Sequence, residues 1–153
     1  MSPTTESPSP PPLDGELRFD DQARAAAAED FGHVVHQRPE GLVLPTSDED
    51  VAAAVRWAAE QGRTFAAQGQ RHSAFGRAQV RDGIVADMGR LRTVHSIEPD
   101  RVVVDAGATL RQVPAATPPL GLAPPGIPDY LDLSVGGVLV VGGVGSAISA
   151  SVC

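Results

Sequence analysis

Apolar residues in the first half of the chain change between the spacing of helices and the spacing of strands. Behind Ser47, a favoured N-cap residue, four apolar residues occupy the i, i+3, i+4 and i+7 positions of one helix face: Val51, Ala54, Val55 and Ala58. Gly62 marks the end of this helix, and short apolar runs at 41–45 and 64–67 flank it. This order of strand, helix and strand with short links predicts a right-handed parallel crossover unit.

Further elements follow from the same patterns. The segment 20–31 begins with acidic residues and continues with an alanine-rich body, which predicts a helix. Three more elements are expected after residue 80: a strand at 83–88, a hairpin of 94–98 with 101–106 around Pro99-Asp100, and a helix at about 109–117. The predicted fold class is α+β, with a small parallel sheet flanked by helices and the start of a second, mostly antiparallel subdomain.

The two ends of the chain have unusual compositions. Residues 1–18 begin with a Pro- and Ser-rich stretch and are expected to form a disordered tail, with a partner-binding role for 8–12 as the alternative. No charged residue occurs from 133 to 153, and this length makes a transmembrane helix one alternative interpretation. Because glycine and serine dilute this segment and no aromatic or basic anchors flank it, close packing against a ligand is favoured. The apolar side chains of this segment would be buried by a further domain, so they are expected to be exposed when this chain is isolated.

Charge and cysteine content exclude several classes of function. The net charge of −7 and the pI of about 4.9 argue against a protein that binds the phosphate backbone of nucleic acids. The single cysteine, Cys153, allows no internal disulfide. The histidines show no metal-ligand spacing, and His33 and His36 are expected to be structural or exposed, without an evident carboxylate partner. No signal peptide is recognisable at the N-terminus, so a cytoplasmic location is expected.

Candidate chemistry concentrates in the stretch 68–73, QGQRHS. It follows the predicted strand 64–67, beyond the strand's carboxyl end, where sheets of this kind bind ligands. Gly69 allows a tight turn, and successive N–H groups of such a turn can form an anion-binding nest from which His72 projects. The alternative from these residues alone is a surface turn with an incidental histidine.

Several separated motifs carry a resemblance to a known flavoprotein family. They are Asp30-Phe31-Gly32 with the later Pro39 and Pro45, the run 67–78 (AQGQRHSAFGRA), and Asp129-Tyr130-Leu131 leading into Ser134-Val135-Gly136-Gly137. Over roughly residues 20–145 the chain resembles the FAD-binding, PCMH-type domain of the vanillyl-alcohol oxidase and cytokinin dehydrogenase family. Within that family it is most similar to cytokinin dehydrogenases.

The resemblance implies FAD as the cofactor, and His72 as the residue to which this family often bonds the flavin covalently. The loop 68–73 would lie against the FAD pyrophosphate, with main-chain N–H groups as the anion cradle. The implied cofactor-binding residues are Gln68, Gly69, Gln70, Arg71, His72, Ser73, Arg77, Asp129, Ser134, Val140 and Val144.

The resemblance also implies a catalytic role for Asp129. The matching carboxylate of the family lies by the flavin ring and accepts a hydrogen bond or proton from the substrate's amine as hydride leaves. The alternative reading of Asp129 is a turn residue after Pro128.

The sequence departs from the family pattern at the site itself. Arg71 stands where a second glycine is usual, and could either clamp the phosphates or exclude the cofactor; exclusion is expected, because a positive φ would strain an arginine. Arg77 stands where glutamine is common, and Val138 and Val140 replace hydroxyl residues.

Family members are much longer than this chain, which implies that residues 19–153 form the N-terminal portion of the FAD-binding domain. The substrate domain and the returning C-terminal segment would then be missing. One hypothesis is the FAD-binding portion of an oxidoreductase that acts on a small-molecule amine, or on an alcohol. The other is a noncatalytic remnant or nucleotide-binding module. Neither nucleic acid nor a membrane is expected as a partner.

Overall fold

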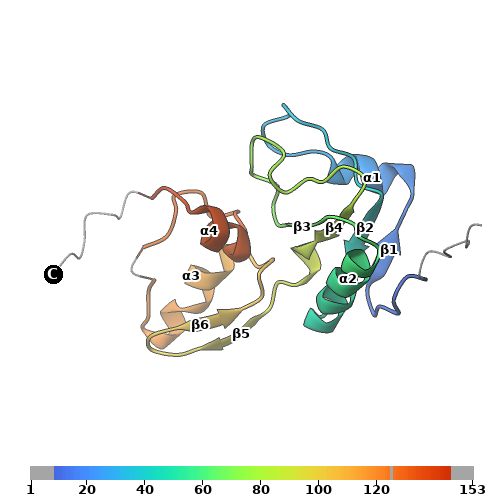
Figure 1. Cartoon of the computed structure of the whole chain (residues 1–153). Helices are drawn as coiled ribbons and strands as arrows, with labels where there is room; N and C mark the ends of the chain where they lie inside the picture. The colour runs from blue at the N-terminus through green and yellow to red at the C-terminus, as the bar shows by residue number, and fades with distance from the viewer. Residues whose placement is uncertain (1–8, 125, 146–153) are drawn as a thin grey trace, which may run out of the picture. The chain divides into compact units, whose positions relative to one another are not determined.

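The computed structural model describes residues 9–124 and 126–145 (Figure 1). The chain forms two compact units that divide between Asp87 and Met88. The first unit contains a four-stranded sheet with two helices, and the second contains a two-stranded sheet with short helices. The α+β class predicted from the sequence is therefore confirmed, including its second, antiparallel part.

The sheet of the first unit has the strand order β1-β2-β4-β3. Its strands are β1 (Glu16–Arg18), β2 (Gly41–Leu44), β3 (Phe65–Gln68) and β4 (Ile84–Asp87). β4 lies between β2 and β3 and is parallel to both, so the three predicted strands form a parallel set. β1 pairs antiparallel with β2, which makes the whole sheet mixed.

β1 corrects the predicted boundary of the N-terminal tail. The tail was expected to reach residue 18, but Glu16–Arg18 pair in register with Leu44, Val43 and Leu42 of β2. Three residues with alternate burial are too short to give a periodic signal in the sequence. The strand forms because an edge of β2 is available for pairing, which is a tertiary condition. The beginning of the tail, residues 1–8, lies outside the described residues.

Both helices of the first unit begin close to their predicted starts, and α2 begins at its predicted cap. α1 (Asp21–Ala27) follows Asp20, whose carboxylate accepts a hydrogen bond from the Ala23 N–H. α2 (Asp48–Glu60) follows Ser47, whose hydroxyl accepts from the Asp50 N–H. α1 ends four residues before the predicted limit at residue 31, because the chain turns there to meet the loop after β3.

The core of the first unit lies on both faces of the parallel strands. Ala23 and Ala27 of α1 cluster with Leu42 and Val85 on one face. Because side chains alternate along a strand, the neighbours of Leu42 and Val85 point to the other face, where α2 contacts β3 and β4. The fully buried residues of these elements are Val43, Ala54, Ala58, Ile84, Val85 and Ala86.

The second unit begins with the predicted hairpin. β5 (Val94–Ile97) and β6 (Val102–Val104) are antiparallel, with an irregularity between Val94 and Ser96. The Asp105 carboxylate accepts from the Thr93 N–H and lies 2.5 Å from Nε2 of His95. Burial alone would raise the pKa of Asp105, but the hydrogen bonds from His95 and Thr93 outweigh it and lower that pKa.

The helical parts of the second unit differ from the prediction. Two 3₁₀ turns, η1 (Met88–Arg90) and η2 (Pro118–Leu120), flank the hairpin and the short α3 (Gln112–Ala116). The helix expected at 109–117 is shorter because prolines lie inside it and directly after it. α4 (Val135–Val141) forms in the uncharged segment, behind Ser134 as the N-cap. No helix within residues 9–124 and 126–145 is long and apolar enough to cross a membrane.

Candidate functional site

The loop that follows β3 lies at the carboxyl edge of the parallel strands. Gln68 is the last residue of β3, and the stretch 69–73 continues from it without regular structure. Gln68 is paired in register with Asp87, the last residue of β4. The loop therefore lies at the ligand-binding edge that the sequence predicts for QGQRHS.

The main chain of this loop contains a left-handed residue beside two N–H groups. Arg71 has a φ of 57°, in the left-handed region on which the expectation of exclusion depends. The N–H groups of Gly69 and Gln70 donate to no protein acceptor within the described part of the chain. Gly69 is half-buried and Gln70 is exposed. These groups are available to an anionic ligand at the edge of the sheet.

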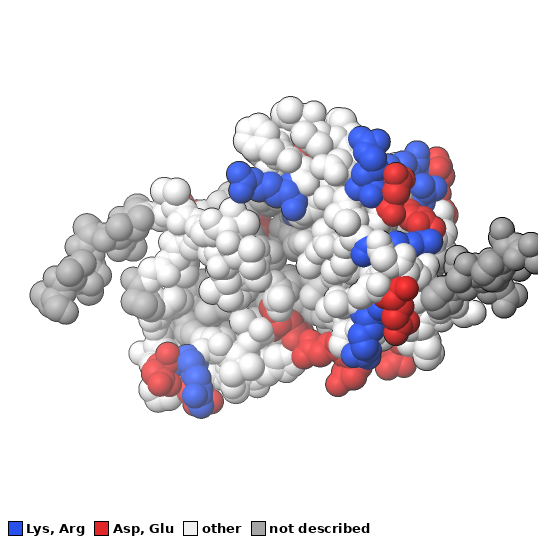
Figure 2. All heavy atoms as spheres, viewed as in Figure 1, with Lys and Arg blue, Asp and Glu red and all other residues white. Residues whose placement is uncertain are grey.

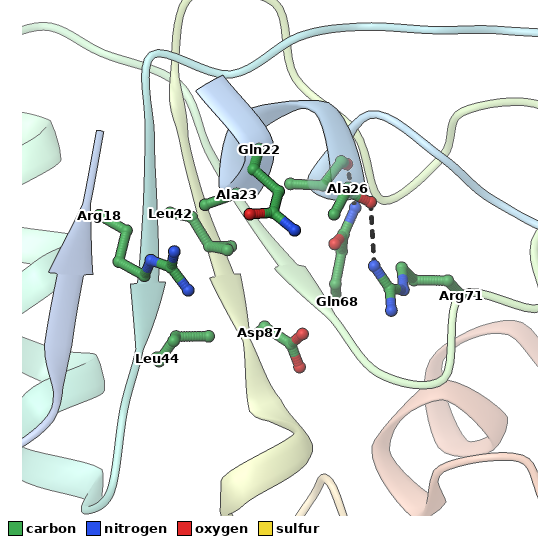
Figure 3. A pocket seen from close by; sticks show the side chains of 10 residues that line it. Arg18, Gln22, Ala23, Ala26, Leu42, Leu44, Gln68, Arg71 and Asp87 are labelled. Atoms are coloured by element: carbon green, nitrogen blue, oxygen red, sulfur yellow. Dashed lines mark hydrogen bonds between the residues drawn. The ribbon is translucent and has the colours of Figure 1, made fainter. Parts of the chain in front are cut away.

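Two side chains of the same loop bind the C-terminal end of α1. The Gln68 amide Nε2 donates to the Ala27 carbonyl at 2.7 Å, and Nη1 of Arg71 donates to the Ala26 carbonyl at 2.9 Å (Figure 3). The last carbonyls of a helix have no partner within the helix, so these bonds cap α1. The Arg71 guanidinium thus contacts the protein's own main chain, a partner that neither of the two roles considered from the sequence includes.

Asp30 fastens the loop from a second direction. Its carboxylate is buried and accepts hydrogen bonds from the N–H of Gly32 at 3.1 Å and of Gly76 at 2.8 Å. Gly32 packs closely here, because a Cβ on it would lie only 2.0 Å from the Ala74 carbonyl oxygen. The sequence showed Asp30-Phe31-Gly32 only as a part of a resemblance. Its structural role depends on a contact between residues 46 positions apart in the chain.

His72 lies beside Phe31 on the outer side of the loop. The two rings are stacked, with centroids 5.4 Å apart and planes 21° from parallel. His72 is half-buried, whereas the Phe31 side chain is largely exposed. An open depression of about 240 Å³ runs along these rings, with Gln70 and Arg71 in its lining. Ser73 is half-buried and Arg77 is exposed.

The expectation for His33 and His36 needs one correction. Both histidines do have a carboxylate partner, because each Nδ1 lies 3.1 Å from an oxygen of Glu29. All three side chains are exposed, so this is a surface cluster. No group of three side chains suited to holding a metal occurs among the residues that the structure describes.

A cavity of about 250 Å³ lies between α1 and the carboxyl edge of the sheet (Figure 3). The alanines of α1 line it together with Leu42 and Leu44, and Arg18, Gln22, Asp87 and Arg71 supply its polar groups. Gln68 also lines it, and the Gln68 Oε1 is a buried atom without a hydrogen-bond partner. Sequence patterns do not indicate this cavity, because its walls come from distant segments.

The remaining predicted site residues belong to the second unit. Asp129 is exposed, and its N–H donates to the Val144 carbonyl at 3.2 Å. Ser134 is buried and accepts from the Gly137 N–H at 3.3 Å as the N-cap of α4. Val140 and Val144 are 87% and 83% exposed. The predicted site residues therefore form two groups, with Gln68 to Arg77 in the first unit and Asp129 to Val144 in the second.

The charged side chains of the first unit are mixed in sign. Figure 2 shows acidic and basic side chains next to one another over the face of the first unit that it displays. Several are ion pairs, including Arg18 with Asp20 and Arg63 with Glu40. Pairs of this kind lie at the surface and contribute little to stability.

Comparison with known proteins identifies the family. A family described as an FAD binding domain matches residues 39–151. The chain belongs to this FAD binding domain family. The resemblance found in the sequence is thereby confirmed.

Relatives of this FAD-binding chain include oxidoreductases. It is 37% identical to an uncharacterized oxidoreductase of the fasciation locus of Rhodococcoides fascians, over 88% of this chain and 31% of the relative. It is 38% identical to cytokinin dehydrogenase 10 of Oryza sativa subsp. japonica, over 85% of this chain and 26% of the relative. The chain thus spans less than a third of the length of these relatives.

A solved structure shows the same fold. The 6-hydroxy-D-nicotine oxidase of Arthrobacter nicotinovorans matches with a TM-score of 0.71 and 23% sequence identity, over 88% of this chain and 29% of that chain. The mixed sheet and the antiparallel hairpin therefore belong to a fold that this oxidase shares. Family membership supports FAD as the cofactor, and the open N–H groups of Gly69 and Gln70 fit its anionic pyrophosphate.

The second unit of this FAD-binding chain presents a strongly apolar surface on and beside α4. Leu139, Val140, Val141 and Val144 are between 68% and 87% exposed. This agrees with the exposure expected for the uncharged segment, although Leu133, Val135 and Val138 are half-buried and Ile148 lies outside the described residues. Contiguous exposed apolar side chains favour binding of hydrophobic molecules.

Replacing Leu139 and Val140 together with serine should therefore reduce the binding of a hydrophobic dye to the native chain by roughly half. Dye fluorescence against protein concentration measures this effect. Val103→Ser is the matched control, since Val103 is a half-exposed valine on β6. Equal dye binding by the double variant and the unaltered chain would contradict the prediction.

Proposed function

We propose that this chain is the FAD-binding portion of an FAD-dependent oxidoreductase, with cytokinin dehydrogenase as the most similar activity. The observation that carries the proposal is the loop after β3. It combines a left-handed turn at Arg71 with N–H groups of Gly69 and Gln70 that have no partner among the described residues, at the carboxyl edge of parallel strands. A pyrophosphate carries negative charge that such N–H groups bind well.

His72 is the residue proposed to carry the flavin covalently. It directly follows the turn, and its ring is held by stacking on Phe31. That contact favours a defined orientation of the ring, which helps attachment to a single flavin atom. When bound, FAD accepts a hydride, and a protein group bonded to the ring changes its reduction potential.

Asp129 is the proposed catalytic residue. Its carboxylate is exposed, while its main-chain N–H is held by the Val144 carbonyl, so the backbone is fixed and the side chain is accessible. A carboxylate in this state can accept a proton or hydrogen bond from the amine of a small-molecule substrate. Because the chain spans less than a third of its relatives, this activity belongs to a longer protein.

The proposal is tested by the absorption spectrum of the purified chain incubated with FAD. Flavin absorption that remains with acid-precipitated protein, together with a flavin mass on the peptide that contains His72, is the expected result. His72→Ala should abolish retention after precipitation while leaving reversible binding measurable. His36→Ala is the matched control, because His36 is a half-exposed histidine paired with Glu29.

Flavin that washes away on precipitation would refute the covalent bond at His72 and leave reversible FAD binding in place. A chain that binds no flavin under any condition would refute the proposed function. Amine-dependent reduction of bound FAD belongs to the longer protein, so this experiment on the chain tests flavin binding and attachment.

A further inference from the structure

We infer that Arg71 is a positioning residue, which fastens the cofactor loop to the end of α1 and leaves phosphate binding to the loop's main chain. The inference rests on the proposed function for its flavin-binding part. Three features of the structure carry it: the hydrogen bonds of the Arg71 side chain, the strained backbone at the same residue, and the free N–H groups beside it.

Arg71 joins the loop to the end of α1 at two points. Its Nη1 donates to the Ala26 carbonyl at 2.9 Å, across 45 positions in the sequence. Its own carbonyl accepts from the Phe31 N–H at 2.8 Å. The side chain and main chain of one residue thus hold the segment 26–31 in place. Gln68 adds a third bond, to the Ala27 carbonyl.

The electrostatics of this contact favour an arginine. The carbonyls at a helix C-terminus carry partial negative charge, and a cation near them is stabilised. A guanidinium is planar, always charged and able to donate in several directions, so it can cap the helix while its other N–H groups reach solvent. A neutral side chain would provide the hydrogen bond without the charge.

The backbone conformation strengthens the inference. Arg71 has a φ of 57°, a region in which glycine is unstrained and arginine is not. Nothing about the turn itself requires a long cationic side chain, since glycine would form it more easily. The bond to Ala26 is the interaction in the structure that offsets this strain.

The position of the guanidinium separates two tasks within the loop. Arg71 lines both the cavity against α1 and the depression along His72, but its bonded nitrogen is turned toward α1 (Figure 3). The N–H groups of Gly69 and Gln70 donate to no acceptor in the described chain. The main chain therefore offers the donors for an anion, and Arg71 keeps them in their conformation.

Amide hydrogen exchange of the full chain tests the fastening without any ligand. Arg71→Ala should increase exchange at the end of α1 and at residue 31 by about fivefold to tenfold, the range expected when an exposed charge-assisted hydrogen bond is lost. Arg71→Lys should restore part of the protection, because an ammonium can also cap the carbonyls. Arg56→Ala, at an exposed arginine on α2 outside the site, should change nothing. Unchanged exchange in Arg71→Ala would overturn the inference.

Flavin titration separates positioning from direct phosphate binding. In a His72→Ala background, which keeps binding reversible, Arg71→Ala should lower the affinities for FAD and for riboflavin by the same factor, about threefold to tenfold. Arg71→Lys should recover part of the lost affinity. Riboflavin lacks the pyrophosphate, so selective loss of FAD would make Arg71 a phosphate ligand and overturn the inference. Tighter binding by both Arg71→Ala and Arg71→Gly would show exclusion and also overturn it.

The exchange experiment keeps this inference distinct from the proposed function. If the unaltered chain binds no flavin, the proposed function fails, and hydrogen exchange alone decides whether Arg71 fastens the loop. If the chain binds flavin and exchange does not change in Arg71→Ala, the proposed function stands and the role of Arg71 is refuted.

Discussion

Asp50→Ala is expected to lower the free energy of unfolding of the first unit by about 3 kcal/mol, a large part of the 5–15 kcal/mol typical of a domain. The Asp50 carboxylate is buried and accepts hydrogen bonds from the N–H groups of Thr46, Asp14 and Gly15 at 2.8–3.0 Å. The Thr46 hydroxyl adds a fourth, at 3.0 Å. Alanine removes all of them and releases the segment that leads into β1.

The same carboxylate should make the stability depend on pH in a definite direction. Burial alone would raise the pKa of Asp50, but the hydrogen bonds from Thr46, Asp14 and Gly15 outweigh it and hold the pKa below the ordinary value. A carboxyl group whose pKa is lower in the folded state stabilises the fold above its unfolded pKa, about 3.9. That contribution is lost as the pH falls from about 4 through the lowered, folded pKa.

The fluorescence of Trp57 reports unfolding of the first unit specifically. Trp57 is the single tryptophan of the chain, and it lies buried on α2. Urea unfolding followed by its fluorescence at several pH values should show the loss of stability below pH 4 in the unaltered chain and a weaker dependence in Asp50→Ala. The pKa of Asp105 is lowered in the same direction, but Asp105 belongs to the second unit, which this fluorescence does not report.

Glu49→Ala is the matched control, since Glu49 is an exposed acidic residue in the same first turn of α2. It should change the free energy of unfolding by less than about 0.5 kcal/mol. Equal effects of the two substitutions, or an Asp50→Ala variant with an unchanged pH dependence, would show that the four hydrogen bonds do not stabilise the native state.

Asp30→Ala is expected to combine a loss of stability of about 2 kcal/mol with a roughly tenfold loss of flavin affinity. The substitution leaves the buried N–H of Gly76 without its acceptor and removes the bond to the Gly32 N–H. The loop after β3 then keeps Arg71 and Gln68 as its connections to α1. A less ordered loop must lose more conformational entropy when it binds a ligand.

Limited proteolysis and FAD titration measure the two effects of Asp30→Ala. Cleavage should appear within residues 69–80, and affinity should fall in the same variant. Glu29→Ala is the control, because the adjacent Glu29 pairs only with exposed histidines in the described structure, and surface pairs contribute about 0–1 kcal/mol. If the affinity for FAD falls without new cleavage, Asp30 affects ligand binding by a mechanism other than ordering the loop.

Local signals explain which elements could be predicted. The cap Ser47 was recognisable because serine is a favoured N-cap residue, and its hydroxyl does accept from the Asp50 N–H. The hairpin of β5 and β6 followed from a turn pair between two valine-rich runs. β1 and α4 were missed, since a strand of three residues has no period and glycines at 136 and 137 are poor helix formers.

The candidate site shows the same division between local and distant interactions. The position of QGQRHS after a strand is a property of neighbouring residues, and the sequence indicated it. The partners of Arg71 and Asp30 lie 45 and 46 positions away, and no periodicity relates such residues. Sequence reasoning therefore placed the loop correctly but could not foresee what its arginine contacts.

The sequence by itself determined the family, the fold class and the order of the main strands and helices, because motifs, caps and apolar spacing act over a few residues. The tertiary structure decided that β1 pairs with the edge of the sheet and that Asp50 of α2 binds the segment before β1. It also decided that Arg71 and Asp30 fasten the cofactor loop. Each of these rests on a hydrogen bond between distant segments, whose donor and acceptor meet only after the parallel strands and α1 have packed.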